Sequence, residues 1–281
     1  MVEFDSAYHR LRIVDNDGVR ILKFERNQQS SMLLDDIFET TMEYLGYMLI
    51  TLAVKPDAAR TLVIGLGGGS LVKRLWRDYP DMFLDAVELD PDVVQVAICY
   101  FGMPENDERI RVTVGDGREF VQLSPDTYDI IMVDVFDDDR VPRPFTTEEF
   151  MRECRDLLSP DGVIAWNVFG AIYGPHSRQF RSFHRTAANV WRHVWTFPIN
   201  FAENKLDDSR NIVMLASDAN LTDDELAERI GTRVDGLVAV PAFERYAEDL
   251  YRGPMRTGDV PLLSDEASGR GHRDGGVSKR R

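Results

Sequence analysis

The feature that most constrains the fold is a glycine-rich turn directly after a short apolar run. Residues 61–64 read Thr-Leu-Val-Ile, glycine follows at positions 65, 67, 68 and 69, and residues 71–78 then have the composition of a helix. Glycine lets a backbone turn sharply and approach a ligand closely, and ligands of open parallel sheets bind where strands end. The turn therefore predicts an α/β core with a ligand site at residues 65–69.

Further strand-like segments follow this turn at regular intervals. Apolar, β-rich runs occur at residues 84–89, 110–114, 128–133 and 162–166, and Pro91 occupies the first turn of an expected helix. Strands that alternate with helices predict a parallel sheet covered by helices on both faces. We therefore expect the α/β class, with a Rossmann-like sheet.

The residues before this core read as strands followed by a helix. Segments 9–14 and 19–24 are rich in β-formers and flank Asp17-Gly18, which is typical of a hairpin turn, and residues 38–52 carry apolar side chains at helical spacing. We expect an N-terminal β-strand domain with this helix at 1–52 and a Rossmann-like catalytic domain at 53–218. A helical extension at 219–267 would begin at the capping-box pattern of residues 222–225, and a disordered tail would occupy 268–281.

Composition excludes several classes of protein. The formal net charge of -15 disfavours nucleic acid as a partner, because binding to phosphates requires basic surfaces. No stretch approaches the roughly 20 apolar residues of a membrane span, and the N-terminus lacks the pattern of a signal peptide. With Cys99 and Cys154 as the two cysteines, a disulfide framework or a cysteine-based metal site is not expected. These features favour a cytoplasmic protein that uses no metal.

Three expected strand ends carry residues suited to a nucleoside. Gly65, Gly67 and Gly68 follow the first strand, and Glu88 ends the second, 19 residues after Gly69. An acidic residue at about this distance binds the hydroxyls of a ribose in dinucleotide folds. After the third strand, residues 115–117 (Gly-Asp-Gly) place a carboxylate where an adenine amino group could donate to it. Ser70 departs from the dinucleotide fingerprint, so an S-adenosyl ligand explains the set better.

The fourth strand ends in an acidic segment. Asp134 directly follows the strand, and Asp137 comes three positions later. Two carboxylates there would bind an ammonium group and could accept its proton, which an amine must lose before it attacks carbon. The spacing is equally compatible with an acidic loop that caps a helix.

The motifs together resemble those of the spermidine and spermine synthase family of aminopropyltransferases. The resemblance spans about residues 8–217, with the motifs in the order that the family has. The matching segments are 8–9, 29–30, 65–70, 87–90, 115–117, 128–137, 145–150 and 161–163. It implies a small N-terminal β-domain packed on a Rossmann-like catalytic domain, commonly in a homodimer. The donor would be decarboxylated S-adenosylmethionine and the acceptor a diamine such as putrescine, giving spermidine and methylthioadenosine.

The resemblance also implies roles for individual residues. Glu88 would hold the ribose, and Asp116 with Gly117 the adenine. Asp134 would be the base that deprotonates the attacking amine, and Asp137 would help to hold the diamine. Substrate binding would further involve three residues of the N-terminal region, namely His9, Gln29 and Tyr44, with Tyr47 as an alternative to Tyr44.

The sequence departs from the family pattern at several positions. Gly68 stands where the family has an aspartate that faces the amine end of the donor, so ordinary S-adenosylmethionine is also a possible donor. His9 replaces a glutamine, Asp138 a proline and Asn167 a glutamine. Two alternatives therefore stay open, an S-adenosylmethionine-dependent methyltransferase and a catalytically silent nucleoside-binding protein.

Overall fold

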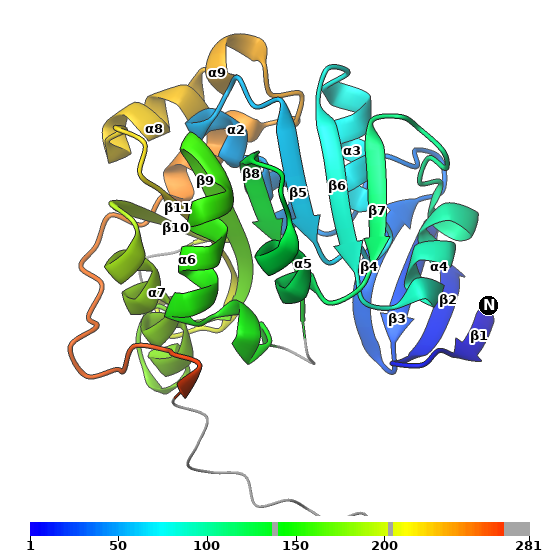
Figure 1. Cartoon of the computed structure of the whole chain (residues 1–281), viewed down its shortest axis with the longest axis horizontal. Helices are drawn as coiled ribbons and strands as arrows, with labels where there is room; N and C mark the ends of the chain where they lie inside the picture. Colours follow the sequence, from blue (N-terminus) through cyan, green and yellow to red (C-terminus); the bar gives the residue numbers. More distant parts are fainter. Residues whose placement is uncertain (137–139, 202–204, 267–281) are drawn as a thin grey trace, which may run out of the picture.

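The computed structural model describes residues 1–136, 140–201 and 205–266 (Figure 1). The expected tail at 268–281 lies outside the described residues. The strands are β1 (Val2–Asp5), β2 (Arg10–Asn16), β3 (Val19–Phe24), β4 (Asn27–Leu33), β5 (Arg60–Ile64), β6 (Phe83–Glu88), β7 (Ile110–Val114), β8 (Tyr128–Val133), β9 (Leu158–Gly170), β10 (His193–Pro198) and β11 (Arg210–Ser217).

Most of the helices lie in the connections between these strands, and the last ones follow β11. They are α1 (Tyr44–Met48), α2 (Thr51–Val54), α3 (Ser70–Asp78), α4 (Pro91–Phe101), α5 (Gly117–Leu123), α6 (Glu148–Leu157), α7 (Arg178–Val190), α8 (Asp223–Gly231) and α9 (Arg233–Gly236), with short 3-10 turns η1 (Arg143–Phe145), η2 (Pro175–Ser177) and η4 (Phe243–Asp249). The expected capping box is confirmed, because Thr222 and Glu225 bond reciprocally at the start of α8.

The N-terminal strands form an antiparallel sheet in the order β1-β2-β3-β4. Asp17 and Gly18 connect β2 to β3 with φ values of 48° and 78°. Two successive residues with positive φ are what a two-residue hairpin turn requires, so the expected hairpin is confirmed. Val93, Val96 and Phe101 of α4 pack against the apolar side chains of this sheet. Figure 1 shows the sheet beside α4, near the carboxyl ends of β6 and β7.

The main sheet of the described residues has the order β10-β11-β9-β8-β5-β6-β7. Strands β5 to β9 are parallel, as expected, whereas β11 is antiparallel to β9 and β10 is antiparallel to β11. The Rossmann-like α/β fold is confirmed, but the sheet is mixed rather than wholly parallel. The two extra strands form a hairpin-like pair, which needs no crossover helix and so breaks the alternation that the sequence pattern relies on.

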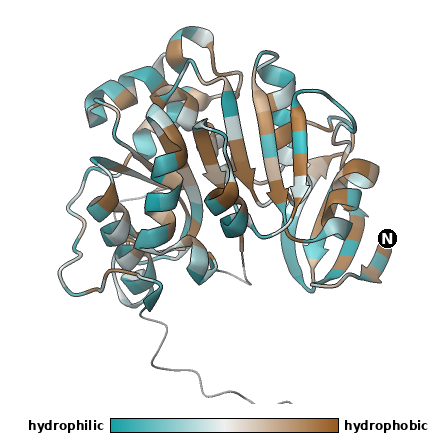
Figure 2. Cartoon of the chain, viewed as in Figure 1, coloured by the Kyte–Doolittle hydropathy of each residue, from teal (hydrophilic) through white to brown (hydrophobic). Residues whose placement is uncertain are grey.

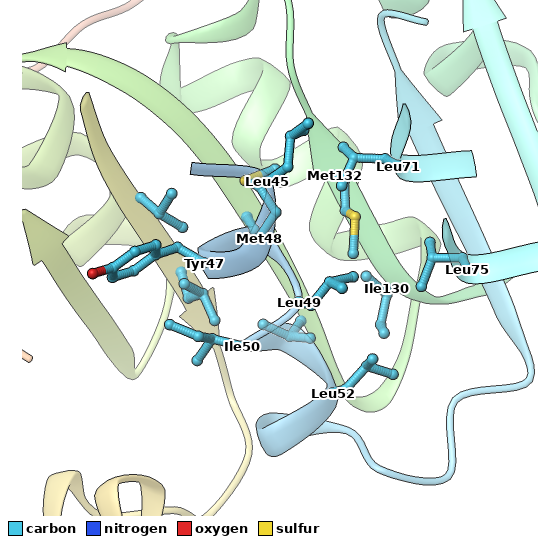
Figure 3. Packing of buried hydrophobic residues seen from close by; sticks show 14 of the residues in the cluster. Leu45, Tyr47, Met48, Leu49, Ile50, Leu52, Leu71, Leu75, Ile130 and Met132 are labelled. Carbon is cyan, nitrogen blue, oxygen red and sulfur yellow. The ribbon is translucent and has the colours of Figure 1, made fainter. Parts of the chain in front are cut away.

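Successive residues of each central strand contribute to opposite faces of the sheet. Ile130 and Met132 pack with α1, α2, α3 and α8 on one face, while Ile131 and Val133 pack with α5, α6 and α7 on the other. Figure 2 shows the central strands in hydrophobic colours, and Figure 3 shows Leu49 and Leu52 packed near Ile130. The sheet is therefore buried on both faces, and its carboxyl edge is where a ligand has access.

The helix expected over residues 38–52 is shorter than predicted and divided. Helix α1 begins at Tyr44 and α2 at Thr51. Before α1, the hydroxyl of Ser31 lies 2.9 and 2.7 Å from the hydroxyls of Thr40 and Thr41, and it also accepts a bond from the Thr41 backbone N–H. Side-chain hydroxyls that bond in this way compete with helical hydrogen bonds. The tether to β4 therefore holds residues 40–41 out of the helix.

Within the described parts of the chain, no helix has both the length and the apolar character needed to cross a lipid bilayer. The same residues contain no group of three or more histidine, cysteine or acidic side chains arranged to hold a metal ion.

Candidate active site

A cavity opens at the carboxyl ends of β5, β6, β7 and β8, where the N-terminal sheet approaches the main sheet. It brings together residues from segments that are far apart in the sequence. Its described lining is His9, Phe24, Gln29, Ser30, Tyr44, Ile64, Gly65, Leu66, Gly67, Val87, Glu88, Leu89, Gly115, Asp116, Gly117, Asp134, Val135, Phe136, Pro142 and Phe145. This set includes most of the residues that the sequence nominated.

Glu88 is fixed at the end of β6 by two backbone donors. Its Oε2 accepts from the N–H of Leu66 at 2.9 Å, and its Oε1 accepts from the N–H of Asp90 at 3.0 Å. Each carboxylate oxygen can accept more than one hydrogen bond, so both retain capacity toward the cavity. Glu88 is therefore positioned to receive a pair of neighbouring hydroxyls.

Asp116 and Gly117 lie where β7 leads into α5. Asp116 caps the helix, and its Oδ1 accepts from the N–H groups of Arg118 and Glu119 at 2.8 and 2.9 Å. A Cβ at Gly117 would lie 2.5 Å from Cγ2 of Ile64 and 3.2 Å from the ring of Phe145. The backbone at Gly117 therefore packs directly against Ile64 and Phe145, which also line the cavity, and Oδ2 of Asp116 takes no part in the cap.

The glycines of the turn lie in two environments, some at the cavity and one against the packed side chains of α4 and β4. Gly65 and Gly67 line the cavity. Gly65 has φ +90°, and a Cβ there would lie 2.3 Å from the carbonyl oxygen of Asp134, so only glycine lets β5 and β8 end this close together. Gly68 does not line the cavity. A Cβ at Gly68 would point to Phe101, 2.8 Å away, and to Ser30, 3.0 Å away.

The position of Gly68 changes what its departure from the family pattern means. We expected Gly68 to contact the donor, but its missing side chain points toward α4 and β4. Its N–H donates to Oγ of the buried Ser30 at 2.8 Å. The glycine therefore serves the packing of the N-terminal sheet on the turn.

Asp134 follows β8, and its carboxylate accepts two side-chain hydrogen bonds. Tyr44 of α1 donates to Oδ2 at 2.9 Å, and Asn167 of β9 donates through Nδ2 to Oδ1 at 3.2 Å. Burial raises the pKa of the Asp134 carboxyl above its ordinary value, and the bonds from Tyr44 and Asn167 act in the opposite direction. A higher pKa makes Asp134 a stronger proton acceptor, while the two donors favour its charged form.

The two tyrosines of α1 have different partners. The hydroxyl of Tyr44 bonds to Asp134 in the cavity, and the hydroxyl of Tyr47 bonds to Asp249 of η4. Burial and the nearby Asp134 charge raise the pKa of Tyr44 well above its ordinary value, so its hydroxyl stays protonated and donates. Tyr44 is therefore the tyrosine that belongs to the site.

Two further nominated residues line the same cavity from the N-terminal region. The ring of His9 stacks on Phe24, with ring centroids 4.3 Å apart, and Gln29 is contributed by β4. Asp137 and Asp138 lie outside the described residues, so the proposed role of Asp137 in holding a diamine stays a prediction.

From the sequence we named the segments that contain Ser30 and Phe145, and we named Asn167, but we assigned none of the three residues a role in the site. Asn167 follows Trp166, which pairs with Val133 across β9 and β8, so Asn167 lies beside Asp134 at the sheet edge. Aligning the expected strand ends at residues 133 and 166 could have revealed this contact, because these two residues are paired and the next residue of each chain segment follows them. Ser30 offers no comparable signal, since its partner is a backbone group of a distant turn.

Solved structures share this architecture. A probable spermidine synthase from Corynebacterium glutamicum superposes with a TM-score of 0.74, at 20% sequence identity, and the match covers 100% of this chain and 98% of that one. At this identity the similarity concerns the fold.

Two named relatives have similar sequences over different lengths. The human eEF1A lysine and N-terminal methyltransferase is 34% identical over 120 residues, which cover 38% of this chain and 17% of that protein. The polyamine aminopropyltransferase of Chromobacterium violaceum is 33% identical over 187 residues, which cover 66% of this chain and 70% of that protein. The longer similarity is thus to the aminopropyltransferase.

The family assignment follows from the sequence profile as well. Residues 43–188, which include Tyr44, Glu88, Asp116, Asp134 and Asn167, match the model of the spermine/spermidine synthase domain. The resemblance seen in the sequence motifs is confirmed, and the chain belongs to the spermine/spermidine synthase domain family.

Proposed function

We propose that the protein transfers an aminopropyl group from decarboxylated S-adenosylmethionine to a small amine. The observation that carries this proposal is the buried Asp134 carboxylate, held by Tyr44 and Asn167 in the same cavity as Glu88 and Asp116. One end of the cavity thus offers acceptors for a nucleoside, and the other offers a base for an amine. The family membership and the named aminopropyltransferase relative support this activity.

The donor would bind across the ends of β5, β6 and β7. Glu88 would accept hydrogen bonds from the two ribose hydroxyls, as its position between Leu66 and Asp90 allows. The free Oδ2 of Asp116 would accept from the adenine amino group, and the close packing at Gly117 would seat the ring. The aminopropyl arm would then extend past Gly65 toward Asp134.

The reaction would be a single in-line displacement. The acceptor nitrogen forms a bond to the carbon attached to sulfur while the carbon–sulfur bond breaks, and the electron pair stays on sulfur. Methylthioadenosine leaves as a neutral thioether, and the nitrogen gives one proton to Asp134, which passes it to solvent. Holding both reactants in line supplies much of the rate in such reactions, and a positioned base typically adds about 10²- to 10⁴-fold.

The electrostatics of the cavity favour a cationic acceptor such as putrescine. Its described lining contains the carboxylates of Glu88, Asp116 and Asp134 and neither lysine nor arginine. A cleft lined by negative charge concentrates cations. Spermidine would be the product if putrescine is the acceptor.

A second candidate is methyl transfer from ordinary S-adenosylmethionine. Gly65 and Gly67 line the cavity without side chains and Gly68 points away from it, so the glycine turn contributes no carboxylate that would repel the carboxylate of that donor. The sequence similarity to the eEF1A methyltransferase is consistent with this candidate.

Product analysis separates these activities. The purified protein would be incubated with each donor and a panel of amines that includes putrescine, and the products would be identified by mass spectrometry. Methylthioadenosine together with an aminopropylated amine supports the proposal, and S-adenosylhomocysteine supports methyl transfer. Donor binding without turnover on any amine would contradict both and leave a nucleoside-binding protein. A homodimer and a cytoplasmic location stay predictions from the sequence.

A further inference from the structure

A chain of two hydrogen bonds leads to Asp134 from β11, the strand next to the edge strand β10. Asn211 of β11 donates through Nδ2 to Oδ1 of Asn167 at 2.9 Å, and Asn167 donates through Nδ2 to Oδ1 of Asp134 at 3.2 Å. Asn167 pairs with Val213 in the β9–β11 ladder, so Asn211, two positions from Val213, is its diagonal neighbour on the same face. The strand register therefore places the two amides in contact.

The direction of these bonds depends on Asn211. A primary amide has a donor end and an acceptor end that are nearly the same shape, and it can turn over. Asn167 is only 1% exposed, so water does not select its orientation. Because Asn211 occupies the oxygen of Asn167 with a donor, the NH2 group of Asn167 is the end that faces Asp134.

We propose that Asn211 is a positioning residue for the acceptor-side base: through Asn167, it keeps an N–H donor, rather than a carbonyl oxygen, directed at the carboxylate of Asp134. The proposal rests on the proposed function in taking Asp134 as the base for the acceptor amine. Asn211 itself does not line the cavity, and it acts only through its neighbour.

The consequence concerns the charge of Asp134. An N–H donor stabilises a carboxylate, whereas a carbonyl oxygen at the same place repels it unless the carboxyl is protonated. A protonated Asp134 could not accept a proton from the acceptor amine. The orientation of Asn167 thus favours the ionised form of Asp134, which is the form that can accept a proton.

Four other titratable residues lie near Asp134 or line the same cavity among the described residues. Tyr44 of α1 bonds to it directly. Among the described residues, the same cavity is also lined by His9, which precedes β2, by Glu88 of β6 and by Asp116, which caps α5. Tyr44 also lies within hydrogen-bonding reach of Asn167, so a change at Asn167 reaches Asp134 both directly and through Tyr44. A change at Asn211 is therefore transmitted to Asp134 through Asn167.

Two substitutions test whether Asn211 sets the direction of the hydrogen bonds from Asn211 through Asn167 to Asp134. Asn211→Leu removes the donor at similar volume, and Asn211→Asp replaces it with an acceptor that would turn Asn167 over. For each variant, kcat/KM would be measured from about pH 5 to 9 and divided by the wild-type value. This ratio is expected to fall toward about one tenth at the acid end of the profile. This corresponds to a rise of about one unit in the pKa of Asp134. The ratio should return toward one at the alkaline end.

Two further variants distinguish positioning from a general loss of structure. In an Asn167→Leu background, Asn211→Leu should cause no further shift of the profile, because non-additive effects identify residues that act through one another. Asn16→Leu is the control, since Asn16 likewise donates its side-chain amide to a neighbouring side chain, the carboxylate of Asp17, but on the exposed hairpin. Its profile should match the wild type.

A titration that needs no turnover keeps the inference separate from the proposed function. Carbon-13 NMR of protein labelled at the aspartate carboxyls, with Asp134→Asn to assign the signal, reports the pKa of Asp134 directly. It should rise in both Asn211 variants. If it and the pH profile are unchanged while the proteins remain folded, the inference is overturned. If no donor and amine react, the proposed function fails, and the NMR titration still decides the role of Asn211.

Discussion

The hydroxyl of Tyr44 donates a 2.9 Å hydrogen bond to Oδ2 of Asp134, across a separation of 90 positions in the sequence. The bond joins the short helix α1, which precedes the sheet, to the end of the central strand β8. One turn further along α1, the hydroxyl of Tyr47 makes a similar bond to Asp249. The Tyr44–Asp134 pair belongs to the candidate site, and the Tyr47–Asp249 pair can serve as its control within the same molecule.

Replacing Asp134 by asparagine should abolish transfer while preserving donor binding. The variant keeps the shape of the side chain but cannot accept the proton of the amine, so kcat is expected to fall by at least about 100-fold. Calorimetric titration with the donor should give an affinity within about threefold of the wild type, because Glu88 and Asp116 are untouched. Asp249→Asn is the matched control and should retain its kcat. Wild-type turnover in Asp134→Asn would exclude Asp134 as the base.

The Tyr44→Phe variant should shift the pH dependence of kcat/KM. It removes one of the two donors that lower the pKa of Asp134, so burial raises that pKa further and more of the carboxyl is protonated at acid pH. Activity relative to the wild type is expected to fall most at the acid end of the profile, by up to roughly tenfold for one pKa unit. A full pH profile measures this.

The control for this variant is Tyr47→Phe. It breaks the bond to Asp249 and should lower stability without moving the profile. Identical pH profiles for Tyr44→Phe and Tyr47→Phe would show that the Tyr44 hydroxyl does not influence the base.

Gly68→Ala should destabilise the fold. The new Cβ would lie 2.8 Å from the ring of Phe101 and 3.0 Å from Cβ of Ser30, closer than atoms pack without rearrangement. Overpacking of this kind costs about 1–3 kcal/mol, which urea denaturation can measure. Gly231→Ala, at the end of α8, meets nothing within 4 Å and should be neutral or slightly stabilising. If the two variants were equally stable, Gly68 would not be confined by Phe101 and Ser30.

His184 should make the fold less stable in acid. Burial lowers its pKa from 6.5 to about 4, so between these values the unfolded chain binds a proton that the folded protein does not. Stability therefore rises with pH across this window and is lost as pH falls from about 6.5 to 4, by on the order of 2 kcal/mol. The difference in unfolding free energy between the wild type and His184→Gln, which does not titrate, isolates this contribution. A difference that is constant from pH 7 to 4.5 would contradict it.

Local sequence signals predicted much of the molecule. The Asp17-Gly18 hairpin, the start of α4 at Pro91 and the cap at Thr222 are each determined by a few neighbouring residues, and the structure has all three. Features that depend on distant partners were not predictable. The late start of the helix expected at 38–52 follows from bonds between Ser31 and two threonines, which no periodicity reveals.

The candidate site likewise has features that the sequence predicts and features that depend on distant contacts. By itself, the sequence determined that glycines, Glu88, Asp116 and Asp134 follow successive strands, because the order of strand ends is written along the chain. Only the tertiary structure decided that Tyr44 and not Tyr47 reaches Asp134, that Gly68 faces Phe101, and that Asn211 bonds to Asn167. These contacts depend on lateral strand order and on the rotation of short helices, which packing against distant segments sets.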